Sequence, residues 1–224
     1  RKNGRNHHPH ALDQGVDLNR NYPFRWNTLG EVGSSSEPGH DKYRGPSAGS
    51  EPETKAMMAL AERENFVASI SYHSGTVCIL APYTIDGVKS PTPNEAWQIG
   101  RHVSKRMPRH FEDRPFRLRR NLYPVDGTDQ DWLRAEHGTL ARLVEAGRRP
   151  PRTTCGRREV LRVNRPSWTL LLSRLLEGPG ILGSVVDVRG RPVRAKVSIK
   201  EQTVRAGETW HSRRRDGVFG RYVT

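Results

Sequence analysis

The order of strand-like and helix-like segments is the feature that most restricts the fold of this chain. Short β-rich runs alternate with segments of helical period, in the order helix 50–61, strand 66–73, strand 77–81, helix 92–107, helix 128–138, strand 139–145 and helix 164–177. From Ile181 onward the sequence shows strand patterns alone. Strands that alternate with helices, followed by strands alone, predict an α/β domain with a separate all-β module behind it.

Residue types that begin and end helices set the predicted boundaries. Ser50 followed by Glu53 has the form of a capping box, and Pro93 occupies the first helical position of the next helix. In the closing helix we expect Pro166 in the first turn and Gly178 just after the last. The apolar residues expected on one face of that helix are Trp168, Leu171, Leu172 and Leu175.

The last part of the chain is predicted to be an incomplete β-sandwich. The run ILGSVVDVRGRPVRAKVSI is typical of a strand, an Arg-Gly turn and a second strand, and DGVFGRYVT is typical of the middle of a further hairpin. A sandwich of the immunoglobulin type needs about 100 residues. We therefore expect residues 179–224 to be a partial β-sandwich domain and residues 1–178 to be the α/β domain.

Charge and composition exclude two classes of partner. A formal net charge of +14 suggests phosphate binding, but the arginines are spread through loops, without a helix-turn-helix, a zinc finger or interleaved aromatic residues. We therefore predict that nucleic acid is not the partner. No run of roughly eighteen apolar residues occurs, which predicts no membrane span. Cys78 and Cys155 lie in no C-x-x-C pair, so one disulfide and two free thiols stay equally open.

Two motifs place polar side chains where strands end. Asn19 and Arg20, in GVDLNRN, offer an amide and a bidentate guanidinium, which suit a carboxylate ligand, although a loop arginine is more often a surface residue. His73 ends a predicted central strand, at the edge where open α/β sheets bind ligands. A lone histidine is more often structural than a metal ligand, and both interpretations stay open.

Two further residues are candidates of the same kind. Glu145 closes the apolar run TLARLVE, as a turn residue or as a buried acid whose raised pKa would suit a general base. Tyr123 lies in a Pro- and Gly-containing loop, where loop packing is the simpler interpretation.

Taken together, these motifs resemble the zinc-dependent metallocarboxypeptidases, the family of carboxypeptidases A, B, N and E. The motifs in the order of the family are GVDLNRN, YRGPSAGSEPE, SYHS, the Tyr123 loop with QDW, and Glu145. The resemblance covers residue 1 to about 177. It implies a mixed central sheet with helices on both faces, followed by a partial transthyretin-like, carboxypeptidase regulatory domain.

The resemblance implies that the substrate is the C-terminus of a peptide or protein. Asn19 and Arg20 would bind its free α-carboxylate, Tyr123 would close over it, and Gln130 would be a further substrate-binding residue. Removal of C-terminal amino acids by a zinc-dependent peptide hydrolase is the activity that follows.

The same resemblance assigns the chemistry. His73 becomes a ligand of one zinc ion, Glu145 the general base that deprotonates a zinc-bound water, and Arg1 the group that steadies the oxyanion. Asp17 would orient a zinc-binding histidine that is not in this sequence.

The sequence departs from the family at the zinc site. The first two family ligands come from an H-x-x-E motif, and His7, His8 and His10 each lack a glutamate three residues on. Since a catalytic zinc takes three protein ligands, we expect two further ligands upstream of this chain and predict that the chain by itself is inactive.

Substrate preference is less well defined. Gln130-Asp131-Trp132 and the β module resemble the N/E branch, which prefers C-terminal Lys or Arg, yet Thr84 replaces the aspartate of that branch and Asp86 substitutes only if the loop differs. A non-catalytic protein that binds peptide termini and a zinc hydrolase of cell-wall peptides are the alternatives. The family implies a secreted or periplasmic location, while natural substrate and oligomeric state stay open.

Overall fold

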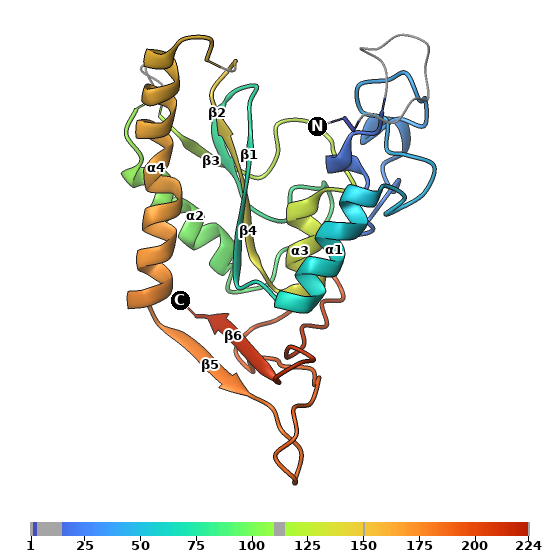
Figure 1. Ribbon diagram of the computed structural model, residues 1–224, viewed down its shortest axis with the longest axis vertical. Helices are drawn as coiled ribbons and strands as arrows, with labels where there is room; N and C mark the ends of the chain where they lie inside the picture. Colours follow the sequence, from blue (N-terminus) through green and yellow to red (C-terminus); the bar gives the residue numbers. More distant parts are fainter. Residues whose placement is uncertain (1, 4–14, 110–114, 150, 224) are drawn as a thin grey trace.

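A four-stranded mixed sheet forms the centre of the molecule (Figure 1). The computed structural model describes residues 2–3, 15–109, 115–149 and 151–223. In spatial order the strands are β1 (Ala68–His73), β4 (Leu140–Ala146), β2 (Val77–Leu80) and β3 (Arg117–Arg119). The pairs β1/β4 and β2/β3 are parallel, and β2/β4 is antiparallel. The predicted mixed α/β sheet is therefore confirmed.

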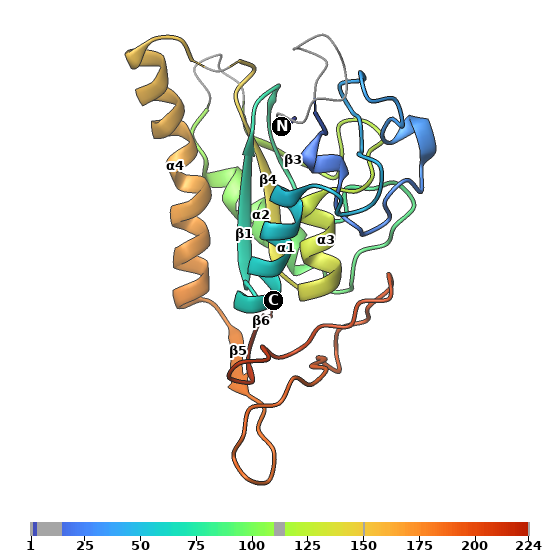
Figure 2. The same ribbon diagram turned by 45° about the vertical axis from the view of Figure 1, so that its right-hand side comes forward.

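Helices cover both faces of this sheet, as predicted (Figures 1 and 2). One face carries α2 (Glu95–Arg106) and α4 (Thr154–Glu177), and the other carries α1 (Pro52–Glu64) and α3 (Asp129–His137). Because side chains alternate along a strand, β4 sends Leu140 and Val144 into the core beneath α2 and α4, and Ala141 into the core beneath α1 and α3. This burial on both faces explains why its sequence is almost continuously apolar.

Two helices begin differently from the prediction. The first, α1, has Glu51 at its N-cap and Pro52 as its first residue, and Ser50 makes no cap because its hydroxyl donates to the Glu51 carboxylate at 2.7 Å. In α2 the cap is Asn94, whose side chain accepts from the Trp97 N–H at 3.1 Å, so Pro93 lies before the helix. Each helix thus begins one or two residues later than the pattern predicted.

The closing helix α4 is longer than predicted. It begins after Thr153, whose hydroxyl accepts from the Gly156 N–H at 3.1 Å, so Pro166 lies in its interior. The Asn164 amide donates to the carbonyl of Ala146 at 3.2 Å and ties the helix to the end of β4. The expected apolar face is only partly correct: Leu171 is buried and Leu175 packs against the core, whereas Trp168 and Leu172 are 46% and 48% exposed.

The C-terminal segment forms a two-stranded ribbon. Its strands β5 (Gly180–Ser184) and β6 (Val218–Tyr222) pair antiparallel, so the start of the first predicted strand pairs with the end of the chain. The predicted Arg-Gly turn is present, because the N–H groups of Asp187 and Val193 donate across it to the carbonyls of Arg191 and Val185, both at 2.9 Å. Between them the described structure contains isolated bridges such as Val186–Pro192. No sandwich forms within the described residues, and the predicted domain boundary after residue 178 stays a prediction.

This segment packs against the α/β domain. The indole of Trp210 is 4% exposed and donates to the Arg134 carbonyl at 2.9 Å. The Glu208 carboxylate accepts a hydrogen bond from the Tyr83 hydroxyl at 2.7 Å. Buried contacts of this kind join the ribbon to the domain rather than leaving it on a free linker.

The structure shows the state of the two cysteines and the character of the described helices. Cys78 is buried in β2 and Cys155 is exposed on α4, and both are free thiols. Among the helices that the structure describes, none combines the length and apolar character needed to cross a membrane.

Candidate active site

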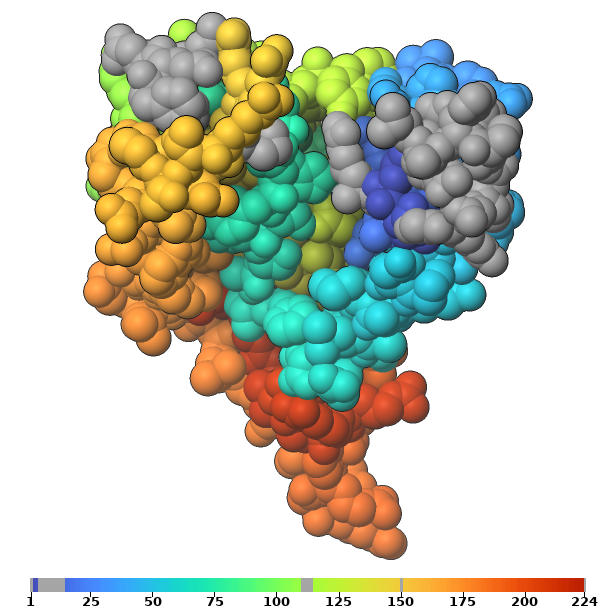
Figure 3. All heavy atoms as spheres, turned by 45° about the horizontal axis from the view of Figure 1, so that its top comes forward, coloured from blue at the N-terminus to red at the C-terminus, as the bar shows by residue number. Residues whose placement is uncertain are grey.

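A cleft of about 910 Å³ opens at the carboxyl-terminal edge of β1 and β4. Figure 3 looks onto the hollow between the teal strand β1 and the blue segment near residue 20. The cleft is lined by all six of the predicted site residues that the structure describes: Asn19, Arg20, His73, Tyr123, Gln130 and Glu145. Arg1, like His7, His8 and His10, lies outside the described residues.

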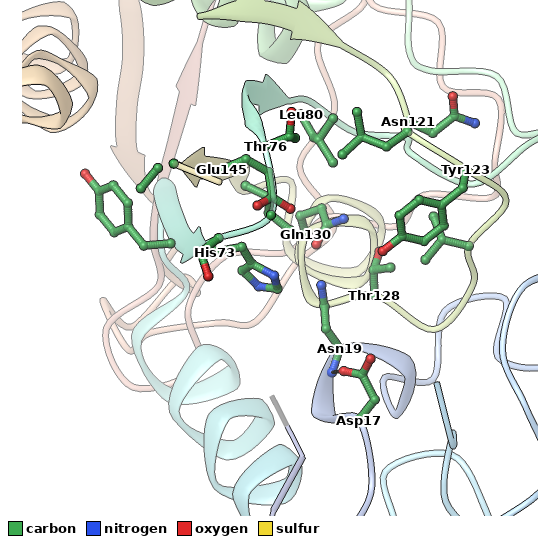
Figure 4. A pocket seen from close by; sticks show the side chains of 18 of the residues that line it. Asp17, Asn19, His73, Thr76, Leu80, Asn121, Tyr123, Thr128, Gln130 and Glu145 are labelled. Carbon is green, nitrogen blue, oxygen red and sulfur yellow. Dashed lines mark hydrogen bonds between the residues drawn. The ribbon is translucent and has the colours of Figure 1, made fainter. Parts of the chain in front are cut away.

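His73 and Glu145 are adjacent because β1 and β4 are parallel and in register. Their Cα positions pair directly, so both side chains reach the same edge of the sheet (Figure 4). Burial lowers the pKa of His73, and the nearby carboxylates of Asp129 and Asp17 oppose that shift. A largely neutral imidazole, which is the form able to ligate a metal, is therefore favoured at neutral pH.

The Asn-Arg pair is held in a single turn of 3-10 helix, η2 (Leu18–Arg20). Asp17 caps this turn by accepting from the Asn19 N–H at 3.1 Å. The Arg20 guanidinium is 5% exposed and donates to the Asn19 carbonyl at 2.6 Å and to the Tyr123 hydroxyl at 3.2 Å. A buried, already oriented guanidinium facing the cleft suits a carboxylate ligand.

Asn21, the second asparagine of the motif, is a structural centre that the sequence analysis did not single out. Its fully buried amide donates to the carbonyls of Arg44 and Ser47 and to the Ser50 hydroxyl at 2.8–3.0 Å. Its oxygen accepts from the Glu51 N–H at 3.1 Å. The repeated asparagine in NRN was the available signal, but its partners lie far along the chain.

Asp129 is a second residue that sequence reasoning missed. Its carboxylate accepts a hydrogen bond from Ser71 on β1, and its N–H donates to the Asn19 side chain at 2.8 Å. Burial raises its pKa, against the lowering effect of Ser71 and the His73 charge. Asp129 thereby links three segments around the cleft. An acidic residue in the first turn of α3 was the only signal in the sequence.

A glycine permits the loop that carries Tyr123 to approach η2. Gly127 has a φ of +64°, and a Cβ there would lie 2.5 Å from the Arg20 carbonyl oxygen. Its own carbonyl accepts from the Tyr22 N–H at 3.0 Å. Because only glycine fits this approach, residue 127 fixes the distance between the Arg20 turn and the Tyr123 loop.

The floor of the cleft is built from α3 and the loop after β2. Gln130 is 2% exposed and donates to the Thr84 hydroxyl at 3.1 Å. That hydroxyl donates in turn to Asp131 at 2.8 Å, which also accepts from the Thr84 and Ile85 N–H groups at 2.8 and 3.0 Å. Asp86 instead accepts from Asn121 at 2.6 Å. The buried acid beside Thr84 therefore already holds the loop.

Lys42 adds a positive charge that the sequence analysis did not predict. Its ammonium lies 4.6 Å from the centre of the Tyr123 ring, while Arg20 approaches the same ring at 5.9 Å. Tyr123 is 47% exposed, so these two cations hold an otherwise accessible side chain at the cleft wall.

The donors present do not complete a zinc site. A catalytic zinc takes three protein ligands, typically histidines and carboxylates. Within the described residues, His73 is the histidine that lines the cleft, and no three His, Cys, Asp or Glu side chains are grouped closely enough to hold a metal ion. These residues therefore supply one ligand of the kind that the family implies.

Sequence comparisons agree on one family. The family model described as zinc carboxypeptidase matches residues 1–150. "Zinc carboxypeptidase A 1" of Anopheles gambiae is 31% identical over 122 residues, which cover 53% of this chain and 28% of that protein. "Metallocarboxypeptidase A" of Arthroderma otae is 30% identical over 160 residues, 66% of this chain and 37% of that protein. The chain thus spans well under half the length of these relatives.

Solved structures share the fold. The crystal structure of carboxypeptidase A from Helicoverpa armigera matches 80% of this chain and 46% of its own with a TM-score of 0.62 at 22% identity. Thrombin activatable fibrinolysis inhibitor matches 76% of this chain and 43% of its own with a TM-score of 0.54 at 26% identity. With a family match over more than half of its residues, the chain belongs to the zinc carboxypeptidase family.

Proposed function

We propose that the protein to which this sequence belongs is a metallocarboxypeptidase that removes C-terminal amino acids from peptides or proteins. The observation that carries the proposal is the convergence of Arg20, His73, Glu145 and Tyr123 on one cleft at the edge of the sheet. These residues come from separate segments, and a chance surface arginine would not be buried facing a histidine-carboxylate pair.

The carboxylate of the substrate would bind to Arg20. Its guanidinium presents Nη2 toward the cleft, where the Tyr123 hydroxyl is its partner at 3.2 Å. Asn19 lines the cleft beside it, with its backbone held by Asp17. A charge-assisted hydrogen bond to a buried guanidinium favours a free C-terminus over an uncharged amide by roughly 1.5 to 3 kcal/mol, about ten- to a hundredfold.

Glu145 would act on the water that attacks the scissile carbonyl. It lies near the carboxyl-terminal end of β4, lines the cleft and pairs in register with His73. Gly75 leaves space beside it, since a Cβ at that position would lie 3.6 Å from a Glu145 oxygen. The carboxylate would accept the water proton and return it to the leaving amine. Zinc is implied by the family, and its further ligands would have to come from outside the described residues.

Peptide binding by the whole chain tests this function. We expect calorimetry to show binding of a short peptide with a free C-terminus at least tenfold tighter than binding of its C-terminal amide. Arg20→Met should remove that difference, whereas Arg101→Met, an exposed change on α2, should keep it. Equal affinity of the wild-type chain for acid and amide would refute the carboxylate site.

A non-catalytic peptide-terminus binding protein is the second candidate. The observation that favours it is the single histidine ligand in the described cleft. Release of the C-terminal residue by the complete protein with zinc, followed by mass spectrometry, separates the two: hydrolysis supports the enzyme, and binding without hydrolysis supports the alternative. Cleavage restricted to cell-wall peptides would instead support a zinc hydrolase that acts on cell-wall peptides.

The charges in the cleft bear on which C-terminal side chain the protein would accept. The acid beside Thr84 is occupied by three hydrogen bonds, and Arg20, Lys42 and Arg149 bring positive charge to the cleft. These features do not favour the basic side chains that the N/E resemblance implies. A secreted or periplasmic location follows from the family alone, and export of the complete protein with its native leader tests it.

A further inference from the structure

An arginine whose guanidinium has no hydrogen-bond partner among the described residues lies inside the core. Arg142, at the middle of β4, is 1% exposed. None of its three guanidinium nitrogens has a hydrogen-bond partner among the described residues. A guanidinium stays protonated in proteins and offers five N–H donors. Leaving such a charge buried and unpaired costs several kcal/mol, so a fold that keeps it needs a compensating negative group.

The direction of the side chain is set by the alternation along β4. Leu140 and Val144, two positions to either side, belong to the core beneath α2 and α4. Arg142 therefore faces the same layer, beside Ile70 of the neighbouring strand β1. The other members of this core are apolar, including Ile99, Val103 and Leu171. Burial alone lowers the pKa of Arg142 to about 10.

The charges that act on His102, in the helix α2 that covers this layer, are all positive. The pKa of His102 on α2 is lowered by burial and by the positive charges of Arg106, Arg174 and Arg142. Arg174, from α4, donates to the backbone carbonyls of Pro179 and Val223 at 3.3 and 2.7 Å and forms no ion pair with another described residue. Arg106 donates to the His102 carbonyl at 3.3 Å. Among the described residues, no carboxylate acts on His102 or on Arg142, whose own pKa is shifted by burial alone.

We propose that Arg142 is the centre of a buried binding site for one small monovalent anion of the halide type, such as chloride, between β4, α2 and α4. A single negative charge compensates the guanidinium. An ion without hydrogen-bonding requirements of its own suits walls that are otherwise apolar. A phosphate or sulfate would bring a second charge and oxygen atoms that these walls do not match.

Thermal unfolding of the whole chain in different anions tests the site. At constant ionic strength, sodium gluconate is replaced stepwise by sodium chloride or bromide. Because an ion that binds only the folded state stabilises it by mass action, we expect Tm to rise and then saturate with either halide. General salt effects do not saturate in this way. In Arg142→Met the halide response should disappear, and in gluconate alone this variant should unfold above the wild type.

Two controls keep the test decisive. Arg101→Met, on the exposed surface of α2, removes the same charge and should keep the halide response. If Arg142→Met fails to fold, Arg142→Lys, which keeps the charge but loses the fork, should shift half-saturation to at least fivefold higher chloride. Crystals grown in bromide should show an anomalous peak at hydrogen-bond distance from the guanidinium. A response unchanged in Arg142→Met, or absent from the wild type, overturns the proposal.

Discussion

The guanidinium of Arg20 donates a hydrogen bond to the hydroxyl of Tyr123 across 3.2 Å, although 103 residues separate them in the sequence. Arg20 sits in a turn capped by Asp17, and Tyr123 sits in a loop held against that turn by Gly127. The donor proposed for a substrate carboxylate is thus already engaged by a neighbouring hydroxyl. A ligand that approaches Nη2 from the same side must displace the Tyr123 hydroxyl.

Removing the Tyr123 hydroxyl should therefore tighten peptide binding. In Tyr123→Phe the ring keeps its contacts with Lys42 and Arg20, but the hydrogen bond to Arg20 is lost. We expect the affinity for a peptide with a free C-terminus to rise about two- to tenfold, because a carboxylate no longer displaces the hydroxyl. Calorimetry with the acid and the amide measures this, and the amide should bind equally to both proteins. Weaker acid binding would mean that the hydroxyl contacts the peptide.

Gly127 should be required for the position of Arg20. Gly127→Ala places a Cβ 2.5 Å from the Arg20 carbonyl oxygen, so the loop must shift. We expect the free energy of unfolding in urea to fall by about 3 kcal/mol and acid-selective peptide binding to weaken. Gly30→Ala is the matched control, with a φ of +57° against +64° and no atom within 4 Å, and should cost about 1 kcal/mol. Equal losses in both variants would contradict the close approach.

Asp131 should make stability fall as pH rises through the weakly acidic range. Burial raises its pKa to about 6, above the value of about 3.9 of an unfolded chain. Between these values the folded protein holds a proton that the unfolded chain releases, so the contribution of Asp131 is most favourable below about pH 4 and is lost through pH 6.

Urea unfolding from pH 4 to 7 measures this effect. Over this range the wild type should lose on the order of 2 kcal/mol more stability than Asp131→Asn, in which position 131 does not titrate. Asp86→Asn, an exposed change of the same charge, should follow the wild-type curve. Parallel curves for wild type and Asp131→Asn would show that Asp131 is ionised throughout.

The two cysteines should differ in reactivity. Cys155 is exposed, whereas Cys78 is buried and burial raises its pKa to about 12. Iodoacetamide at neutral pH should modify Cys155 alone in the native protein, because the thiolate is the nucleophile. Mass spectrometry should then find both thiols modified in denaturant without reductant. Protection of both thiols in denaturant would reveal a disulfide.

The elements that sequence patterns located well are those whose signals are local. The strand ending in His73 and the strand ending in Glu145 were expected within two residues of their observed bounds, because short β-rich runs mark strands locally. Helix α3 was bounded correctly by Thr128 and Gly138. The start of α4 was missed because Pro166 suggests a first turn, whereas tertiary contacts of Asn164 stabilise a longer helix.

The residues of the candidate site also fall into those that a sequence motif indicated and those that only the structure revealed. Motif spacing identified Asn19, Arg20, His73, Tyr123, Gln130 and Glu145, all of which line one cleft. It did not indicate Asn21, Asp129 or Lys42, whose roles depend on partners in other segments. The Asn21 amide, for example, contacts four residues between positions 44 and 51, and no pattern in the sequence around Asn21 indicates those contacts.

By itself, the sequence located most of the strands and helices and the polar residues that end two strands, because periodicity and residue type act over a few neighbours. It did not locate β3 or the start of α4. Only the tertiary structure decided that β4 lies between β1 and β2, which brings Glu145 into register with His73. It also decided that Arg142 faces an apolar layer without a partner among the described residues. Strand order and partnering depend on contacts between distant segments, and these form only when the whole core packs.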